Sequence, residues 1–483
     1  MFRGRNEFKS FAFKGTARPS SDHQMLKFLH LSDVHLGCRR YNIEERTKDF
    51  FRSWFDVIEK HALPNEVDFV LIAGDFFDRR NIDPQTMNHA IAGLQVLRDA
   101  GIPVVVIEGN HDRRDAVSPY SWMRSFSQAG FLILLEPVST EESPLQMVPW
   151  DEEERAGSYV DIKGARVYGS HWYGTTASVA MSLLADALRR SRDEGRFNIL
   201  MLHTDVEGQL NRPIPALPVE KLKELRTLVD YVALGHTHKR FEIDNWAFNP
   251  GSLEACTIDE YREERGAYLV EVDDESRVRA THLRDYVQRP FQRLTFDVSG
   301  AADPEAVHAG VTELVRREAR THDPASGLPE PIIEISLRGH LGFKNSLLDL
   351  RRMREEAREA TGALHVMLKN QSVPVEYAVA AGLEADTSRA HRERRIVEDL
   401  IARDNRFRDR SREMSELVLE AKRRALGEEP PEAILDLIER HLGERLRPSR
   451  PADEEEMAPA PATAAALAAL ERNAATKALA GDE

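Results

Sequence analysis

Cysteine is scarce in this sequence: only Cys38 and Cys256 occur, far apart along the chain. They offer neither a disulfide framework nor a thiolate zinc site, so a reducing compartment is the simplest expectation. Long apolar runs are also missing, and no stretch approaches the roughly 20 residues that a membrane span needs. Residues 1–24 lack the continuous apolar segment of a secretory signal. These absences predict a cytoplasmic protein without a membrane anchor.

Positive charge is in deficit as well. The 483 residues carry a formal net charge of −15, so the chain as a whole repels phosphates. Any contact with nucleic acid must therefore come from a local basic surface or from bound cations. The length allows two or three domains, and the apolar share of 41% allows a sizeable core.

Periodicity divides the chain into regions. Residues 25–286 alternate β-rich runs with helical patterns, which predicts a layered α/β sandwich. Residues 287–370 repeat this rhythm on a smaller scale and predict an accessory domain. A linker over 371–387 precedes a helical region over 388–444, and a mobile acidic and Ala-rich tail is expected over 445–483.

The predicted elements can be stated by range. In the first region, strands are expected at Lys27–Leu31, Asp68–Ala73, Val104–Ile107, Asn198–Leu202, Val229–Leu234, Ala267–Val272 and Arg279–Tyr286. Helices are expected there near Arg46–His61, Pro84–Ala100 and Ala177–Arg192. The helical region is predicted to hold one long helix over Ser388–Leu426 and a second over about Glu432–Leu442.

Five short polar motifs follow predicted strands. They are Asp33-Val34-His35, Gly74-Asp75-Phe76-Phe77-Asp78, Gly109-Asn110-His111-Asp112, the strand end at His203, and Gly235-His236-Thr237-His238. Because ligands sit at the carboxyl ends of strands in open α/β sheets, we expect these clusters to converge on one place. Their donors are oxygen and imidazole without sulfur, which favours manganese, iron or zinc. Two divalent ions there would attract a phosphate diester despite the acidic chain.

Each motif alone has an ordinary structural explanation. Asp-x-His is more often a hydrogen-bonded loop pair, Gly-Asp and Gly-Asn are common turns, and an isolated strand histidine is more often packed. The five together, in order and each at a strand end, favour a two-metal phosphoesterase site. Asp78 and Asp112 are expected to support the ligands rather than to bind an ion.

The motifs resemble those of calcineurin-like metallophosphoesterases. The segments Leu29–Gly37, Gly74–Asp78 and Asn249–Ser252 are similar to the nuclease subunit of the bacterial SbcCD complex. This resemblance implies a four-layer β-sandwich flanked by helices over 25–286, a small α+β capping domain over 287–370 and a C-terminal helical arm over 388–444. Residues 1–24 have no counterpart in that family and are expected to be a disordered extension or to precede the true start at Met25, with a basic N-terminal arm as the alternative.

The resemblance assigns roles to the motif residues. It implies two Mn²⁺ ions, with Mg²⁺ or other divalent ions possible in vitro. The metal ligands it implies are Asp33, His35, Asp75, Asn110, His203, His236 and His238, with Asp75 shared by both ions. His111 would instead assist the departing 3′ oxygen. The activities implied are those of a 3′-to-5′ exonuclease and an endonuclease, acting in DNA end processing and repair. Many relatives carry a histidine where this chain has Asp78, so a contact to the substrate is expected to differ.

The arginine-rich helical arm carries an apolar stripe. Leu400, Phe407 and Met414 are spaced seven apart, and Ile396 and Leu417 broaden the stripe. Packing within the chain and docking on a partner both fit this pattern. The resemblance favours docking on the coiled coil of an SbcC-type, SMC-like ATPase, with two nuclease subunits in a heterotetramer on DNA at the nucleoid. A small-molecule phosphodiesterase or phosphatase, and a non-catalytic scaffold, are the alternative functions.

Overall fold

The computed structural model describes most of the chain, over residues 26–114, 120–140, 143–210, 216–374 and 389–442, apart from 403, 405 and 428. The predicted N-terminal extension, residues 375–387 of the predicted linker and the predicted tail lie outside these ranges. Among the described helices, none has the length and apolar character to cross a bilayer.

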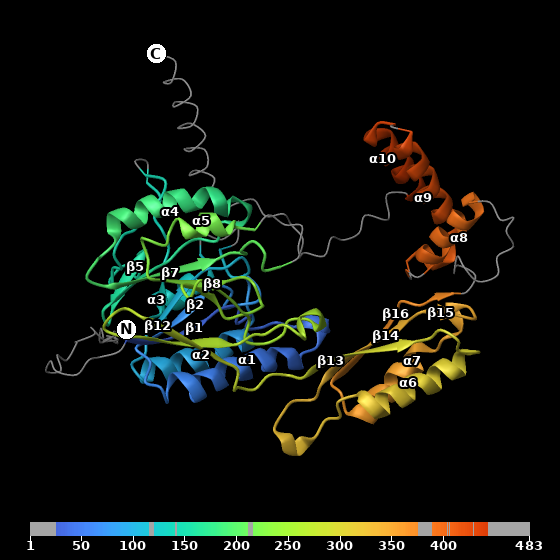
Figure 1. Cartoon of the computed structure of the whole chain (residues 1–483), viewed down its shortest axis with the longest axis horizontal. Coiled ribbons are helices and arrows are strands. Elements are labelled where there is room, and N and C mark those ends of the chain that lie inside the picture. The colour runs from blue at the N-terminus through green and yellow to red at the C-terminus, as the bar shows by residue number, and fades with distance from the viewer. Residues whose placement is uncertain are drawn as a thin grey trace, which may run out of the picture.

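Two six-stranded sheets stack in the first region (Figure 1). The first sheet has the order β12–β11–β1–β2–β3–β4, with bounds Val278–Leu283, Ala267–Val272, Leu26–Leu31, Phe69–Ala73, Val104–Ile107 and Ile133–Leu134. The second has the order β5–β6–β7–β8–β10–β9, with bounds Tyr159–Ile162, Ala165–Tyr168, Phe197–His203, Tyr231–Gly235, Ala247–Asn249 and Phe241–Ile243. The short strands β4, β5, β6, β9 and β10 were not predicted.

Side-chain alternation along the strands builds the layers. In β1, Leu29 and Leu31 pack into the core beneath the helices, whereas Phe28 packs between the two sheets. Successive side chains of a strand point to opposite faces, so both faces of this sheet are buried. In β7, Leu200 faces the helix side and Met201 faces the other sheet in the same way. The fold is therefore the predicted four-layer sandwich of helices, sheet, sheet and helices.

Helices cover both outer faces. The first sheet is covered by α1 (Glu45–Val57), α2 (Pro84–Asp99) and α3 (Trp122–Gln128), and the second by α4 (Ala177–Ser191) and α5 (Val219–Lys223). The start of α2 is fixed by Asp83, whose Oδ1 accepts a 2.8 Å hydrogen bond from Thr86 N, and by Pro84 in the first turn.

The carboxyl ends of the parallel strands lie at one edge of the sandwich. β1, β2 and β3 are parallel in the first sheet, and β7 and β8 are parallel in the second. The two sheets meet at this edge, where His203 Nδ1, at the end of β7, lies 2.8 Å from the carbonyl oxygen of Ala73, at the end of β2. A carbonyl only accepts, so Nδ1 carries the proton. The edge therefore brings together polar segments from both sheets.

A smaller unit follows the sandwich. Its parallel strands β13 (Phe291–Asp297), β14 (Ile332–Arg338) and β16 (His365–Asn370) pack against two helices, α6 (Pro304–Glu318) and α7 (Leu350–Thr361), and a two-stranded pair adds β15 (His340–Leu341) and β17 (Val373–Pro374). Arg289 joins it to the sandwich, because Nε and Nη2 donate to the Asp49 carboxylate of α1 at 2.6 and 2.7 Å. Arg289 also donates to the carbonyl of Glu330. Asp49 also accepts from Arg46 Nη1 at 2.5 Å, so the junction is a buried network of charges rather than one ion pair.

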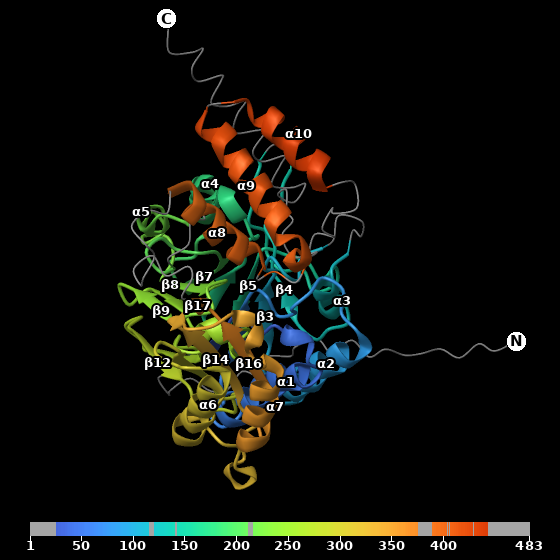
Figure 2. The same cartoon turned by 90° about the vertical axis from the view of Figure 1, so that its right-hand side faces the viewer.

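The helical arm differs from the prediction (Figure 2). Instead of one helix over Ser388–Leu426, the chain forms α8 (Arg389–Ala402) and α9 (Ser411–Leu426), followed by α10 (Pro431–Leu442). The break lies at Asp404, whose side chain accepts from Arg406 N at 2.9 Å while its carbonyl accepts from Phe407 N at 3.0 Å. Such local side-chain bonding competes with the helix and turns the chain.

Part of the apolar stripe of the arm is buried, and part of it is exposed. Met414 and Leu417 are buried against Leu437 of α10, with Phe407 packed at the edge. They stabilise the arm itself and are not available to a partner. Ile396 and Leu400 of α8 remain exposed, as does Val418. The surface that a partner could reach is therefore smaller than the predicted stripe.

Candidate metal centre

The first group of predicted ligands comprises Asp33, His35, Asp75 and His238. His35 Nε2 lies 3.0 Å from His238 Nε2 and 3.9 Å from both Asp33 Oδ1 and Asp75 Oδ2. His238 Nε2 lies 3.8 Å from Asp33 Oδ1. Two imidazole nitrogens and two carboxylate oxygens thus face one small space.

The second group comprises Asp75, Asn110, His203 and His236. His203 Nε2 lies 3.2 Å from Asp75 Oδ2 and 3.2 Å from Asn110 Oδ1. His236 Nδ1 lies 2.9 Å from the same Asn110 oxygen. Asp75 Oδ2 therefore faces both groups.

Several of these residues have a strained backbone conformation. Asp33, His35, Asp75 and His236 all have positive φ, at 51°, 49°, 53° and 89°. Non-glycine residues rarely adopt this conformation, and where they do the surrounding structure enforces it, often at a functional site. Gly109 permits the close approach of the loops, because a Cβ there would lie 2.0 Å from Asp75 Oδ1.

Burial and neighbouring charges shift the pKa values of Asp75 and His203 in opposite directions. Burial acts to raise the pKa of Asp75, but the charges of His203, His111 and His35 outweigh it and hold that pKa well below its usual range. For His203, burial acts to lower the pKa, and Asp75 with Asp33 raises it to about 10. Asp75 thus retains its negative charge beside a positive partner, which is the environment a cation would supply.

The residues present fit divalent metal ions. The His35 and His238 Nε2 atoms face each other as well as two carboxylates, so a proton can satisfy only one nitrogen of this pair, whereas a cation among the four donors satisfies all of them. When His35 Nε2 binds an ion, the proton of the neutral ring lies on Nδ1. This Nδ1 has no hydrogen-bond partner in the described residues and lies 3.6 Å from Asp78 Oδ1. Neutral imidazole and carboxylate are the ligands of manganese, iron and zinc sites.

His111 lies beside the first donor group, with a ring nitrogen within 4.8 Å of ligand atoms of His35 and Asp78. Its backbone N donates to Asp75 Oδ1 at 2.9 Å, and its Nδ1 donates to the carbonyl of Asp78 at 2.8 Å. The ring is exposed and lies 5.0 Å from the His35 ring, centre to centre. The Nδ1 hydrogen bond fixes the ring, so Nε2 is the nitrogen left for exchange with a substrate.

Asp112 shapes the loops from behind. Its Oδ2 accepts from Phe76 N at 2.7 Å, and its Oδ1 accepts from Gly109 N at 2.8 Å. Burial, then the charges of Asp75 and Glu108, raise the pKa of Asp112 to about 7. The side chain thus ties the Asp75 loop to the loop that carries Gly109 and His111.

Two supporting carboxylates were missed by sequence reasoning. Glu260 Oε1 lies 3.2 Å from His238 Nδ1, and its other oxygen accepts from Cys256 N at 2.9 Å. Asp205 Oδ2 lies 3.5 Å from His236 Nε2 and its Oδ1 accepts from Thr237 Oγ1 at 2.7 Å. The spacing of Asp205, two residues beyond a predicted ligand, was a usable signal. Glu260 had none, because its contact depends on how a distant loop folds back.

Glu260→Gln is expected to weaken manganese binding by about 10- to 100-fold, because a carboxylate behind a metal-bound histidine fixes the ring and increases its basicity. Titration calorimetry of the metal-free protein measures the effect directly. Glu263→Gln is the matched control, since its carboxylate is paired with Lys239 at the surface. Equal affinities in the two variants would remove Glu260 from the site.

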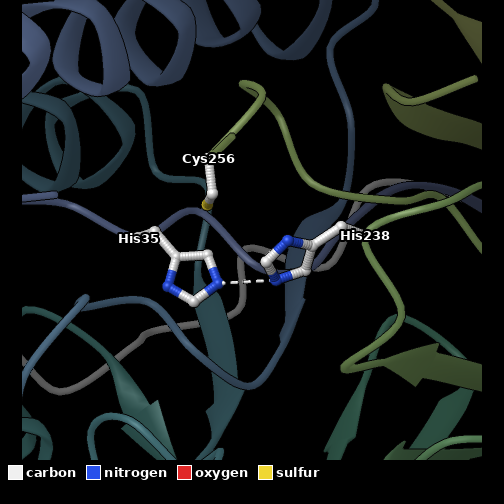
Figure 3. A group of neighbouring side chains, drawn as sticks. All are labelled: His35, His238 and Cys256. Carbon is white, nitrogen blue, oxygen red and sulfur yellow. Dashed lines mark hydrogen bonds between the residues drawn. The ribbon is translucent and has the colours of Figure 1, made fainter. Parts of the chain in front are cut away.

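The two cysteines are neighbours despite their separation in sequence. Cys256 lies beside His35 and His238 (Figure 3), with its sulfur within 4.8 Å of a nitrogen of each. The hydrogen bond with the Cys38 thiol, and then burial, raise the pKa of Cys256 well above its ordinary value. Both cysteines are free and buried. Cys256 therefore lies beside the first donor group, although it is not part of the predicted oxygen and imidazole set.

The sandwich and its two donor groups define a metal-dependent phosphoesterase. Residues 26–240 match the family model of the calcineurin-like phosphoesterases. Three similar proteins are each described as the DNA double-strand break repair protein Mre11. The protein from Aeropyrum pernix is 27% identical, covering 74% of this chain and 82% of its own length. Those from Archaeoglobus fulgidus and Sulfurisphaera tokodaii are 29% and 30% identical, covering 58% and 67% of this chain and 67% and 76% of their own lengths. The chain belongs to the Mre11/SbcD-type nuclease family of calcineurin-like metallophosphoesterases.

Proposed function

We propose that this chain is a manganese-dependent nuclease that hydrolyses DNA phosphodiester bonds, as a 3′-to-5′ exonuclease and as an endonuclease, in the repair of DNA ends. The observation that carries the proposal is the pair of donor groups sharing Asp75 Oδ2, with His111 fixed at their edge. The names of the similar proteins support DNA as the substrate. Acting on DNA, the protein would work in the cytoplasm with the nucleoid.

The proposed mechanism divides the work among the residues. Asp33, His35, Asp75 and His238 would hold one ion, and Asp75, Asn110, His203 and His236 the other. The two ions would supply Lewis-acid activation of the phosphate and of the attacking water. His111 would donate a proton from Nε2 to the departing 3′ oxygen, while its Nδ1 bond to the Asp78 carbonyl keeps the ring in place.

The smaller units are proposed to control access and assembly. Residues 287–370 would form a capping domain that restricts how DNA approaches the edge of the sandwich. This role is supported by the Arg289–Asp49 junction, which fixes the unit to α1. The linker 371–387 would connect it to the arm, 388–444.

The arm is proposed to dock on the coiled coil of an SbcC-type, SMC-like ATPase, within a heterotetramer that contains two nuclease subunits. Ile396 and Leu400 would make the contact, since both are exposed on α8. A helix with an exposed apolar row of this kind can lie against a partner helix. Met414 and Leu417 would contribute by keeping the arm folded.

The test is cleavage of a linear DNA duplex by the purified protein with manganese, with and without the ATPase subunit and ATP. Degradation from the ends, and a change in product pattern when the ATPase is added, are expected. Turnover confined to nucleotide monomers or phosphoproteins would identify a small-molecule phosphodiesterase or phosphatase instead. No hydrolysis of any ester, with both ions bound, would support the scaffold.

A further inference from the structure

Both cysteines of the chain lie next to the first donor group, although one belongs to the loop after β1 and the other to the loop after β10. Cys38 follows His35 on its loop, and the Cys38 amide N donates to the His35 carbonyl at 3.1 Å. Cys256 is held from the other side, because its amide N donates at 2.9 Å to Glu260, the carboxylate behind His238. The fold therefore fixes the backbone of both thiols against the segments that carry two predicted metal ligands.

The sulfur of Cys256 lies close to two imidazole rings (Figure 3). Its distance to a ring nitrogen of His35 and to one of His238 is at most 4.8 Å, and the Nε2 atoms of the two histidines lie 3.0 Å apart. Bonds to zinc are about 2.3 Å long from sulfur and about 2.0–2.1 Å from imidazole nitrogen, so two such ligands lie roughly 3.6 Å apart at the tetrahedral angle. A small movement of these side chains toward one ion would therefore let it bind the sulfur and both rings.

A carboxylate completes a set of four donors. Asp33 Oδ1 lies 3.9 Å from His35 Nε2 and 3.8 Å from His238 Nε2. Together with the Cys256 sulfur, the set offers one oxygen, two nitrogens and one sulfur. Zinc prefers four ligands in tetrahedral geometry, and thiolate is among the ligands that select it. Manganese prefers oxygen ligands in octahedral geometry, so the sulfur favours zinc over manganese.

We propose that the first donor group binds zinc in a closed form, with the Cys256 sulfur as a ligand beside Asp33 and the two imidazoles. As zinc binds, the S–H bond of Cys256 breaks, a zinc–sulfur bond forms and the proton passes to solvent. The Cys38 thiol, which is hydrogen-bonded to Cys256, keeps its proton and can donate it to the bound sulfur.

The closed form has a consequence for catalysis. Four protein ligands fill the tetrahedral shell of zinc, whereas a catalytic zinc site keeps one position open for water or substrate. Zinc bound through Cys256 therefore holds the enzyme inactive, and manganese, with its larger coordination shell, activates it. This inhibition rests on the proposed nuclease function, but the zinc site itself does not.

The first test uses cobalt(II) in place of zinc, because a thiolate ligand gives cobalt a near-ultraviolet charge-transfer absorption that oxygen and nitrogen ligands do not. The full chain is stripped of metal with a chelator and titrated with cobalt(II). The absorption is expected in the parent and in Cys38→Ser, the matched loss of the other thiol, and should vanish in Cys256→Ser and Cys256→Ala. Its absence from the parent would overturn the site, as would its persistence in Cys256→Ser or an equal loss in Cys38→Ser.

The second test measures zinc affinity by competition with a chromophoric chelator, and zinc inhibition of manganese-supported DNA cleavage. Cys256→Ser should bind zinc at least about tenfold more weakly than the parent, since even a group behind a ligand has an effect of that size. Half inhibition should need at least about tenfold more zinc in Cys256→Ser, with each protein compared with its own rate without zinc.

The outcomes separate this inference from the proposed function. Equal zinc affinity in Cys256→Ser and the parent would overturn the role of the sulfur and leave the nuclease function intact. Full DNA cleavage by the parent with zinc bound through Cys256 would overturn the closed form. Zinc bound through the sulfur in a parent that cleaves no DNA with manganese would support the zinc site and overturn the nuclease function.

Discussion

Asp75→Asn is expected to reduce DNA cleavage by on the order of a thousandfold or more and to lower the bound manganese from two ions to at most one per chain. Asp75 Oδ2 faces His35 Nε2 at 3.9 Å and His203 Nε2 at 3.2 Å. An amide keeps the shape but removes the negative charge that both donor groups share. Losing several kcal/mol of charge stabilisation costs a factor of ten for each 1.4 kcal/mol, which gives this magnitude.

Metal content and rate are measured together for Asp75→Asn, by elemental analysis after dialysis against manganese and by duplex cleavage. Asp186→Asn on α4 is the matched control, because its side chain is exposed and paired with Arg189. The same substitution there should leave both quantities at the parent values. Two ions bound in Asp75→Asn with cleavage near normal would show that Asp75 is not shared.

His111→Gln should have the second-largest effect, but on the rate alone. We expect cleavage to fall by roughly 10²- to 10⁴-fold, the range for removing a general acid. Both ions should remain, because the contact to Asp75 comes from the His111 backbone N, which every substitution retains. Glutamine can still donate a hydrogen bond to the Asp78 carbonyl, but it cannot transfer a proton.

The leaving group provides the sharper test of His111. p-Nitrophenolate departs without a proton, so His111→Gln should impair hydrolysis of bis(p-nitrophenyl) phosphate much less than DNA cleavage. His61→Gln is the control, since the His61 ring bonds the Asp285 carbonyl and His61 belongs to neither donor group. An equal loss on the two esters would assign His111 to phosphate binding rather than to proton transfer.

The local sequence pattern was sufficient to predict the long central strands. The predicted strand Val104–Ile107 coincides with β3, and Asn198–Leu202 lies within β7, because buried parallel strands read as continuous apolar runs. The edge strands β5 and β9 are short and only partly apolar, and their pairing with distant strands gives them their identity. The prediction of one long helix in the arm was wrong because Asp404 makes a turn, which hydrophobic periodicity does not reveal.

The family, the layered fold and the enzyme class followed from the sequence, because residues near a strand end share its position at the edge of a sheet whatever the details of packing. The distances within the centre did not follow from it. That Asp75 Oδ2 faces both donor groups depends on two sheets meeting at β2 and β7.

Longer-range contacts were decided by the tertiary structure alone. Glu260 reaches His238, Cys38 meets Cys256, and Arg113 lies on Trp172. Each pair joins segments whose separation is set by the path of a loop, and no local periodicity encodes that path. The residue types of the two donor groups are thus set by short sequence motifs, whereas the contacts that support them depend on how those motifs are packed.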